Sequence, residues 1–371
     1  MLSGLINQHS TIMLPCRRAF LSTSTLACLS TLASSFTLLP RSTSPRNLRI
    51  AARTRATTAR TMSSSQEASI TLMVENTARG RNILGEHGLS WWIEFNDKRV
   101  LFDTGQGQAL LHNAKTLNLP VDSCDAIVLS HGHYDHVGGL EQVLEHSDKE
   151  NKATIFMHQT ALDAKYSGST GTSRCISIPF LHGGDLKKKY QDRIRTFSNQ
   201  DGPVEIVPGL YCTGEIPRRH DWEDTGGPFY LDAELSQPDL LLDDVSLFFE
   251  SDKGIVIILG CCHSGILNTV DYIQELVTAT TNKNNKDSNN LKPIHSVMGG
   301  LHLLSATNER MNKTIQGLKE RNIQAIYPCH CTGDDATFQL QKSLPEGVVR
   351  HAHAGSHWSF HLAEDAATAT K

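Results

Sequence analysis

Three things are scarce in this chain, and each scarcity excludes a class of protein. Residues 1–66 contain no aspartate or glutamate. No apolar run is long enough for a membrane span, since the mildly apolar segment 20–33 is short and rich in serine and threonine. None of the nine cysteines forms a Cys-x₂-Cys pair, and a domain of this size needs no disulfide framework. We therefore expect a protein without membrane spans, in a reducing compartment.

The first 66 residues differ in composition from the rest of the chain. They carry eight arginines and many serines and threonines, which together with the missing acids is typical of an organelle transit peptide. We expect residues 1–66 to be a disordered leader for a mitochondrion or plastid, and a start at Met62 would give a cytoplasmic form. The alternatives are a plain basic tail, or an ER signal followed by a transit segment.

The remaining residues, 67–371, are acidic. Eight of the 35 lysines and arginines lie in the leader, so 27 basic residues face 39 acidic ones, a net charge of −12. Nucleic-acid binding requires a basic face, so this charge disfavours DNA or RNA as the main partner. We expect one globular domain that acts on a small-molecule substrate, and the sequence carries no signal for an oligomeric state.

Apolar segments alternate with helical patterns along this domain. The expected strands are residues 90–95, 99–102, 126–129, 153–157, 246–249, 255–259, 294–297 and 323–327, and the expected helices are 107–119, 140–145, 187–193 and 266–277. This alternation predicts an α/β (α+β) domain with helices covering sheets. Residues 160–245 show little pattern beyond a turn and strand over 202–212, so we interpret them as a variable insertion. The asparagine-rich residues 278–290 are expected to be a flexible loop.

The run His131-Gly132-His133-Tyr134-Asp135-His136 follows the apolar segment 126–129 directly. A strand that ends in a polar turn places its last side chains at the rim of a sheet. Imidazole and carboxylate together suit Zn²⁺, Mn²⁺ or Fe²⁺ better than Ca²⁺ or Mg²⁺. Three histidines and one aspartate in so short a loop fit two adjacent ions better than one, as in two-metal hydrolytic sites.

The segment Ser130–Gly139 resembles the signature of the metallo-β-lactamase superfamily. Four further segments agree with it in order: Asp103-Thr104-Gly105, Gly260-Cys261-Cys262-His263-Ser264-Gly265, Gly299-Gly300-Leu301-His302-Leu303 and Pro328-Cys329-His330-Cys331-Thr332-Gly333. That order resembles the branch named after the dihydropterin–ribofuranosylaminobenzene phosphate synthase of methanopterin-making microbes. The resemblance spans about residues 69–359 and implies a four-layer αββα sandwich.

The resemblance also implies a set of ligands for two divalent transition metals, zinc first, with manganese or iron as alternatives. The ligands would be His131, His133 and His263 for one ion, and Asp135, His136 and His330 for the other, and Asp135 is also the predicted catalytic residue. The chain departs from the superfamily at one point, because no Gly-Asp pair supplies the usual bridging aspartate. Alternatively, His263 occupies the position of that carboxylate, and then occupancy by two ions is in question.

Other polar residues near these motifs receive weaker assignments. His302 and Arg218 are predicted to bind substrate, with Arg219 or a merely solvated loop as the alternative to Arg218. Asp103 is predicted to orient a metal-binding histidine. The motif cysteines are interpreted as small packing residues, and the remaining histidines as surface or core residues: Cys261, Cys262, Cys329, Cys331, and His158, His182, His220, His351, His353, His357.

These assignments favour an enzyme, a metal-dependent hydrolase that acts on a small ester, thioester or phosphodiester through a metal-activated water. The first alternative is a pterin-phosphate synthase-type transferase of the same branch, which the organelle-type leader disfavours. The second is a mononuclear iron oxygenase of the persulfide-oxidising kind, which binds one iron with two histidines and one aspartate. A non-catalytic binding protein is the remaining alternative.

Overall fold

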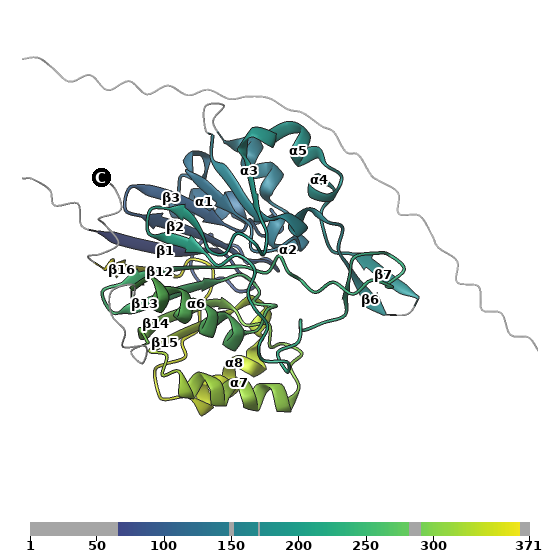
Figure 1. Ribbon diagram of the computed structural model, residues 1–371. Coiled ribbons are helices and arrows are strands. Elements are labelled where there is room, and N and C mark those ends of the chain that lie inside the picture. Colours follow the sequence, from purple (N-terminus) through teal and green to yellow (C-terminus); the bar gives the residue numbers. More distant parts are fainter. Residues whose placement is uncertain (1–65, 148–151, 170, 282–290, 364–371) are drawn as a thin grey trace, which may run out of the picture. The chain divides into compact units, whose positions relative to one another are not determined.

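The computed structural model describes residues 66–147, 152–169, 171–281 and 291–363 (Figure 1). Of the predicted leader, residues 1–65 lie outside this range, as do residues 282–290 of the predicted loop. Helix α6 (Ile266–Thr281) continues four residues past its expected end at 277, so that loop was predicted to begin too early. The extension needs no apolar period, because a helix that has already formed propagates easily, and the Thr278 hydroxyl donates to the Gln274 carbonyl at 2.6 Å.

The first sheet joins the N-terminal strands to the last strand of the chain. Its seven strands have the order β16 (His357–His361), β1 (Glu67–Val74), β2 (Ser90–Phe95), β3 (Lys98–Phe102), β4 (Ala126–Val128), β5 (Thr154–His158) and β8 (Ile194–Phe197). Strands β16, β1, β2 and β3 pair antiparallel, and β3, β4, β5 and β8 pair in parallel. The loop between β1 and β2 therefore lies at the same edge of the sheet as the loops that follow β3 and β4.

The second sheet is built from the C-terminal half. Its six strands have the order β15 (Ala325–Cys329), β14 (Ile294–Gly300), β13 (Gly254–Leu259), β12 (Ser246–Ser251), β10 (Leu210–Cys212) and β9 (Val204–Val207). Strands β13, β14 and β15 are parallel. Because parallel strands end at the same edge, the motif loops after these three strands lie together.

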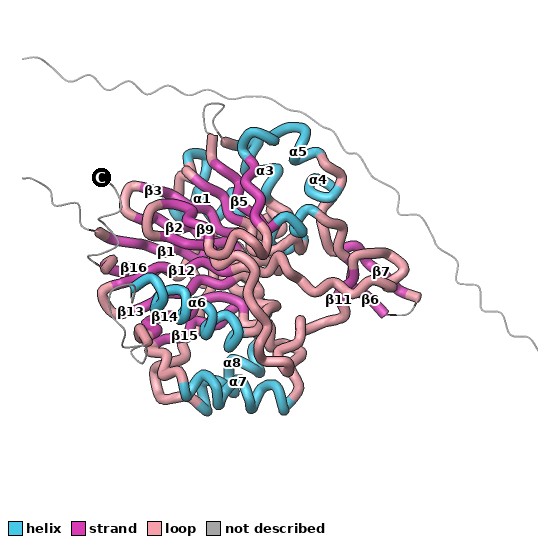
Figure 2. Tube along the Cα trace, in the orientation of Figure 1, coloured by secondary structure: helices cyan, strands magenta, loops and turns pink. Residues whose placement is uncertain are grey.

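Three apolar clusters fix the layers. The central cluster lies between the facing sides of the two sheets. It includes Ile70 and Trp91 from the first sheet and Val256 and Met298 from the second. A second cluster packs the other face of the first sheet against α1 (Leu110–Leu117), α3 (Leu140–His146), α4 (Pro179–His182) and α5 (Asp185–Tyr190). The third packs the outer face of the second sheet against α6, α7 (Asn308–Glu320) and α8 (Asp334–Ser343) (Figure 2). The predicted four-layer αββα sandwich is confirmed.

Residues 160–245 are more regular than the sequence indicated. They supply β8, β9, β10, α4 and α5 to the sandwich, and only a smaller part forms a separate three-stranded sheet. That sheet consists of β11 (Phe229–Tyr230), β6 (Tyr166–Ser169) and β7 (Thr172–Cys175), and β6 and β7 stand at the side of the sandwich (Figure 1). No helix within the described ranges is long and apolar enough to cross a membrane.

Candidate metal centre

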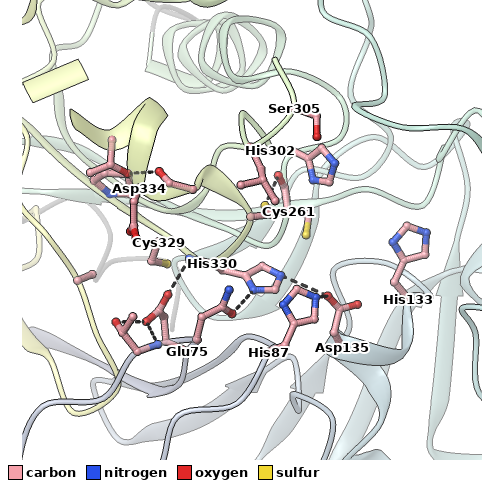
Figure 3. A pocket seen from close by; sticks show the side chains of 18 of the residues that line it. Glu75, His87, His133, Asp135, Cys261, His302, Ser305, Cys329, His330 and Asp334 are labelled. Atoms are coloured by element: carbon pink, nitrogen blue, oxygen red, sulfur yellow. Dashed lines mark hydrogen bonds and ion pairs between the residues drawn. The ribbon is translucent and has the colours of Figure 1, made fainter. Parts of the chain in front are cut away.

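The polar motifs meet at the edge where the parallel strands of both sheets end. From the first sheet come the loop after β4, with the short helix α2 (Tyr134–Val137), and the segments that follow β1 and precede β2. From the second sheet come the ends of β13, β14 and β15, which carry Cys261, His302 and His330. Residues more than 200 positions apart thus face one another across a single cavity of about 960 Å³ (Figure 3).

The first group of candidate ligands is His131, His133 and His263, whose ligand atoms all lie within 4.8 Å of one another. The Nδ1 of His263 lies 2.8 Å from the Thr225 carbonyl oxygen. Because a carbonyl can only accept, Nδ1 carries the hydrogen and donates it. His131 Nδ1 likewise faces the Ser130 hydroxyl at 2.9 Å, and that hydroxyl donates its own hydrogen to Asp103 at 2.7 Å. The Nε2 atoms of all three histidines are buried without a partner among the described residues. Three unpaired, converging imidazole nitrogens fit a transition-metal ion.

The second group is formed by Asp135, His136 and His330. His330 Nε2 lies 3.2 Å from His136 Nε2 and 3.4 Å from the Asp135 carboxylate. His136 Nδ1 donates to Asp103 at 2.6 Å, and His330 Nδ1 faces the Asn76 side-chain oxygen at 2.9 Å. Both Nδ1 atoms therefore donate outward, and the two Nε2 atoms and a carboxylate converge on the same space. A cation there would take the place of the hydrogens held between these atoms, so this group also fits a metal.

Burial and neighbouring charges set the protonation of these groups in the metal-free protein. Burial, followed by the neighbouring histidines, holds the pKa of His131 and of His263 well below the usual range, and burial lowers the pKa of His133 to about 3. Burial alone would lower the pKa of His136, but the Asp103 carboxylate outweighs it and raises that pKa to about 9. The first group is therefore neutral at neutral pH, which is the form that binds metal.

Asp103 supports both groups, as the sequence predicted. Its side chain is fully buried, and it accepts hydrogen bonds from the Ser130 backbone and hydroxyl, both at 2.7 Å, besides the bond from His136. Through Ser130 it also reaches His131. One carboxylate thus orients one histidine of each group.

The backbone is strained where the strands end. Asp103, Cys262, His302 and His330 adopt positive φ angles of 60°, 61°, 45° and 51°. Each such residue costs about 1–3 kcal/mol, which the surrounding packing must offset. The left-handed conformation turns the chain sharply at each strand end, and His263 and Cys331, which follow Cys262 and His330, line the cavity.

A buried ion cluster lies behind the histidine loop. Lys165 is fully buried, and its ammonium donates to Asp239 at 2.8 Å and to Asp243 at 3.0 Å. The second oxygen of Asp243 accepts the Gly132 backbone N–H at 2.7 Å. A Cβ on Gly132 would lie 2.6 Å from the Ala161 carbonyl and 2.9 Å from the Lys165 stem, so only glycine fits between the two histidines. The sequence pattern did not reveal this cluster.

The other predicted residues divide into two sets. His302 lines the cavity, and its ring centre lies 4.1 Å from that of His263. Arg218 is not among the lining residues, because its guanidinium donates to the carbonyls of His263 at 2.8 Å and Leu240 at 2.7 Å. Arg219 pairs with Glu275 on α6. The geometry gives Arg218 a role in holding the His263 loop, and its substrate contact stays a prediction.

Several cavity residues were missed or interpreted differently from the sequence. His87, in the loop before β2, lies 3.2 Å from the Asp135 carboxylate and forms a candidate ligand group with Asp135 and His330. His351 and His353, interpreted as surface or core residues, line the cavity. Cys261, interpreted as a packing residue, has its sulfur among the candidate ligand atoms. His87, His351 and His353 reach the cavity only through the fold, so no pattern in the sequence indicated them. For Cys261 there was a signal, because it follows Gly260 where the superfamily usually has an aspartate.

The chain belongs to the metallo-β-lactamase superfamily, a superfamily of enzymes whose members typically bind divalent metals. The superfamily's sequence model matches residues 84–153. A 7,8-dihydropterin-6-methyl-4-(β-D-ribofuranosyl)-aminobenzene-5′-phosphate synthase of Methanocaldococcus jannaschii is 30% identical over 283 residues, which cover 73% of this chain and 88% of that relative. An uncharacterized protein of the same organism is 32% identical over 273 residues, covering 74% of this chain and 94% of the relative.

Among solved structures, a metal-dependent hydrolase of the β-lactamase superfamily matches with a TM-score of 0.60 and 25% identity, covering 78% of this chain and 98% of that one. The predicted superfamily, fold and resemblance to the synthase branch are therefore confirmed.

Proposed function

We propose that the protein is a metal-dependent hydrolase that uses water to cleave a small ester, thioester or phosphodiester. The observation that carries this proposal is the set of three buried, unpaired Nε2 atoms of His131, His133 and His263, beside a second group with a carboxylate, at a cavity of ligand size. Divalent ions held there would bring the pKa of a water toward neutrality and polarise the substrate oxygen, and zinc suits this mixture of ligands best.

The roles of the chain's residues follow from their positions. His131, His133 and His263 would hold one ion, and Asp135, His136 and His330 the other. The Asp135 carboxylate accepts from His87 and lies next to His330, so it is fixed at the junction between cavity and second ion. Phe229 packs 5.0 Å from His133 and 5.2 Å from His263, ring centre to ring centre, and shields that side from water. His302 is placed to hydrogen-bond the substrate.

Two arginines at the cavity wall favour an anionic substrate, and hence a phosphodiester among the three classes. Of the carboxylates that line the same wall, Glu75 accepts from Thr77 and from the His330 backbone, and Asp135 belongs to the second ligand group. Arg79 and Arg174 both line the cavity, and neither has a carboxylate partner within the described residues. Arg174 instead stacks over the Tyr134 ring, 4.9 Å from its centre. In a domain with a net charge of −12, unpaired guanidinium groups at a cavity are suited to a phosphate or carboxylate.

A transferase of the synthase type is the second candidate. It is favoured by the 30% identity with the named synthase, which extends over 88% of that relative. The two reactions differ in the acceptor, since hydrolysis needs only water, whereas the transferase needs a second organic substrate. Turnover of one ester substrate alone therefore distinguishes them.

The test uses the zinc-loaded chain with bis(p-nitrophenyl) phosphate, p-nitrophenyl acetate and an acyl thioester. We expect hydrolysis of the phosphodiester, and its loss in Asp135→Ala at unchanged far-UV circular dichroism. Asp97→Ala, which alters a carboxylate with 85% of its side chain exposed, is the control and should retain activity. A metal-loaded protein that cleaves none of the three, or an Asp135→Ala variant with wild-type turnover, contradicts the proposal.

We also propose that residues 1–66 target the protein to a mitochondrion or plastid, on the strength of eight arginines and no acid in that segment. A fluorescent protein fused after Met62 should enter one of these organelles. Replacing the eight arginines by glutamine should leave the fusion in the cytosol. A diffuse distribution of the unaltered fusion would contradict the proposal without bearing on the enzyme.

A further inference from the structure

The superfamily resemblance implies a carboxylate shared by both ions, and the chain has none at that strand end. Strand β13 ends at Leu259 and is followed by Gly260 and Cys261. Asp135 is the sole carboxylate in the candidate ligand groups found among the described residues. The question is which side chain stands between the two ions.

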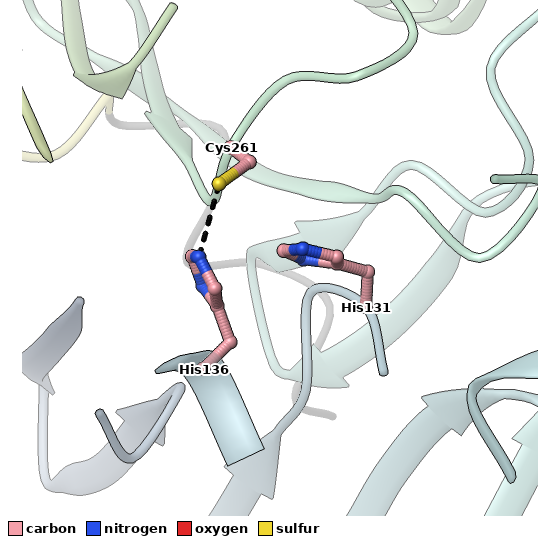
Figure 4. Close-up of side chains that lie close together, drawn as sticks. All are labelled: His131, His136 and Cys261. Carbon is pink, nitrogen blue, oxygen red and sulfur yellow. Dashed lines mark hydrogen bonds between the residues drawn. The ribbon is translucent and has the colours of Figure 1, made fainter. Parts of the chain in front are cut away.

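The sulfur of Cys261 lies between the two proposed ligand sets. It lies within 4.8 Å of the ligand atoms of His131 and His136, of those of His263 and His302, and of those of His330 and Cys331. It therefore reaches members of both proposed ligand sets. Figure 4 shows Cys261 from the second sheet directed at His136, with His131 alongside. Two ligands on one tetrahedral zinc, with bonds of about 2.0–2.3 Å, lie about 3.5 Å apart, which these separations allow.

The contact with His136 identifies what the sulfur does in the metal-free protein. Cys261 Sγ lies 3.0 Å from His136 Nε2, and His136 Nδ1 donates to Asp103. The sulfur and Nε2 are therefore joined by a hydrogen that belongs to one of them. A cation entering this space would replace the hydrogens there, with the S–H bond and any Nε2–H bond broken, sulfur–metal and nitrogen–metal bonds formed and the protons released to solvent.

The neighbouring cysteines do not offer the same geometry. The Cys262 sulfur faces Thr269 on α6 at 3.4 Å and belongs to the apolar cluster under the second sheet. The Cys331 sulfur contacts the Cys261 carbonyl at 3.4 Å and shares a ligand group only with Cys261 and His330. Among the cysteines of the described ranges, Cys261 alone has its sulfur within 4.8 Å of ligand atoms from both proposed sets.

We propose that Cys261 is a thiolate ligand shared by the two ions, in place of the carboxylate bridge. This inference rests on the proposed metal centre. It further implies a preference for zinc, cobalt or ferrous iron over manganese or magnesium, because thiolate is a soft ligand.

Cobalt(II) substitution tests this inference without any assay of activity. A cobalt–thiolate bond gives a charge-transfer absorption in the near ultraviolet, which imidazole and carboxylate ligands do not give. We expect the wild-type chain to bind two equivalents of cobalt with this absorption, and Cys261→Ser to lose it. Cys261→Asp should keep two equivalents without the absorption, because a carboxylate restores the bridge. Cys262→Ser and Cys331→Ser should match the wild type.

The outcomes separate this inference from the proposed function. Wild-type protein that binds cobalt without the absorption overturns the thiolate alone, and so does a Cys261→Ser or Cys261→Asp variant that retains it. Loss of the absorption in Cys331→Ser with its retention in Cys261→Ser assigns the ligand to Cys331 and overturns the inference as well. A wild-type chain that binds no cobalt overturns the metal centre itself. Should Cys261→Ser fail to fold, the Cys261→Asp spectrum decides.

Discussion

The buried cluster of Lys165, Asp239 and Asp243 gives the sharpest prediction about stability. Lys165→Met keeps most of the buried stem but removes the ammonium, which leaves two carboxylates close together without a cation. Breaking a buried ion pair in this way costs about 3–5 kcal/mol, a large share of a total stability of about 5–15 kcal/mol. At about 2–4 °C per kcal/mol for a large domain, the melting temperature should fall by roughly 6–20 °C.

The pH dependence gives a second signature of the same change. Burial alone would raise the pKa of Asp243, but Lys165 outweighs it and lowers that pKa overall. The carboxylate therefore stabilises the wild-type fold above its unfolded pKa, near 3.9, and this contribution is lost as the pH falls below that value. In the variant the Gly132 N–H still bonds Asp243, but the ammonium no longer opposes burial, so the pKa rises. The deficit should therefore be largest at neutral pH and shrink toward about pH 5.

Thermal and urea unfolding of the wild type and of Lys165→Met, at neutral pH and at about pH 5, measure these effects. Lys188→Met is the matched control, since Lys188 pairs with Asp185 at 3.0 Å but both side chains are more than half exposed. Its melting temperature should stay close to that of the wild type. A Lys165→Met variant as stable as this control, or a deficit that grows toward acid pH, would refute the reasoning.

Three further predictions concern the centre and its cavity. Asp103→Asn should weaken zinc binding by about 10–100-fold in a competition with a chelating dye, because the amide cannot accept from His136 and Ser130 as the carboxylate does; unchanged affinity would remove Asp103 from the site. The metal-free protein should be most stable near pH 6.5. Below pH 6.5 the unfolded chain binds protons that His131, His133 and His263 do not bind in the folded protein, so each of these histidines lowers the stability by about 1.4 kcal/mol per pH unit. Above pH 6.5 the raised pKa of His136 means that stability is lost as the pH rises to about 9. Urea titrations that show rising stability from pH 6.5 to 5 would contradict this. Arg174→Ala should raise KM for a phosphodiester about tenfold or more and leave KM for a neutral ester unchanged. Arg81 is exposed and lies outside the cavity, so Arg81→Ala should change neither KM. An equal rise in KM for both substrates in Arg174→Ala would show a structural role instead.

Much of the sandwich could be predicted because its signals are local. Alternating apolar segments marked most of the strands, and the run from His131 to His136 marked the candidate metal-binding loop without any tertiary information. The structure brings His263 to the first group and His330 to the second, which are the sets that the resemblance implied. The alternative in which His263 stands at the bridging position stays a prediction, to which the proposed role of Cys261 is the competing assignment.

The rest depended on contacts between distant segments. His87 stands in a loop without periodicity and reaches Asp135 only because β1, β2 and β3 bring their ends to one edge. Arg218 was predicted to bind substrate, and the sequence could not show that its guanidinium donates to the carbonyls of His263 and Leu240, which belong to separate segments. Lys165 was hidden among residues whose strands are short and whose ion partners lie more than 70 positions away.

The buried cluster around Lys165 also bears on how such a site could be re-engineered. All three of its charged members lie within residues 160–245, and one carboxylate oxygen of the cluster accepts a backbone N–H of the histidine loop. A transplanted segment would therefore bring its own charge balance for the cluster. The recipient must supply the strands that pair with β8 and β10, and it must have glycine between its two histidines, because the segment leaves no room there for a side chain. Glycine at that one position is thus a requirement for exchanging cavity walls between relatives.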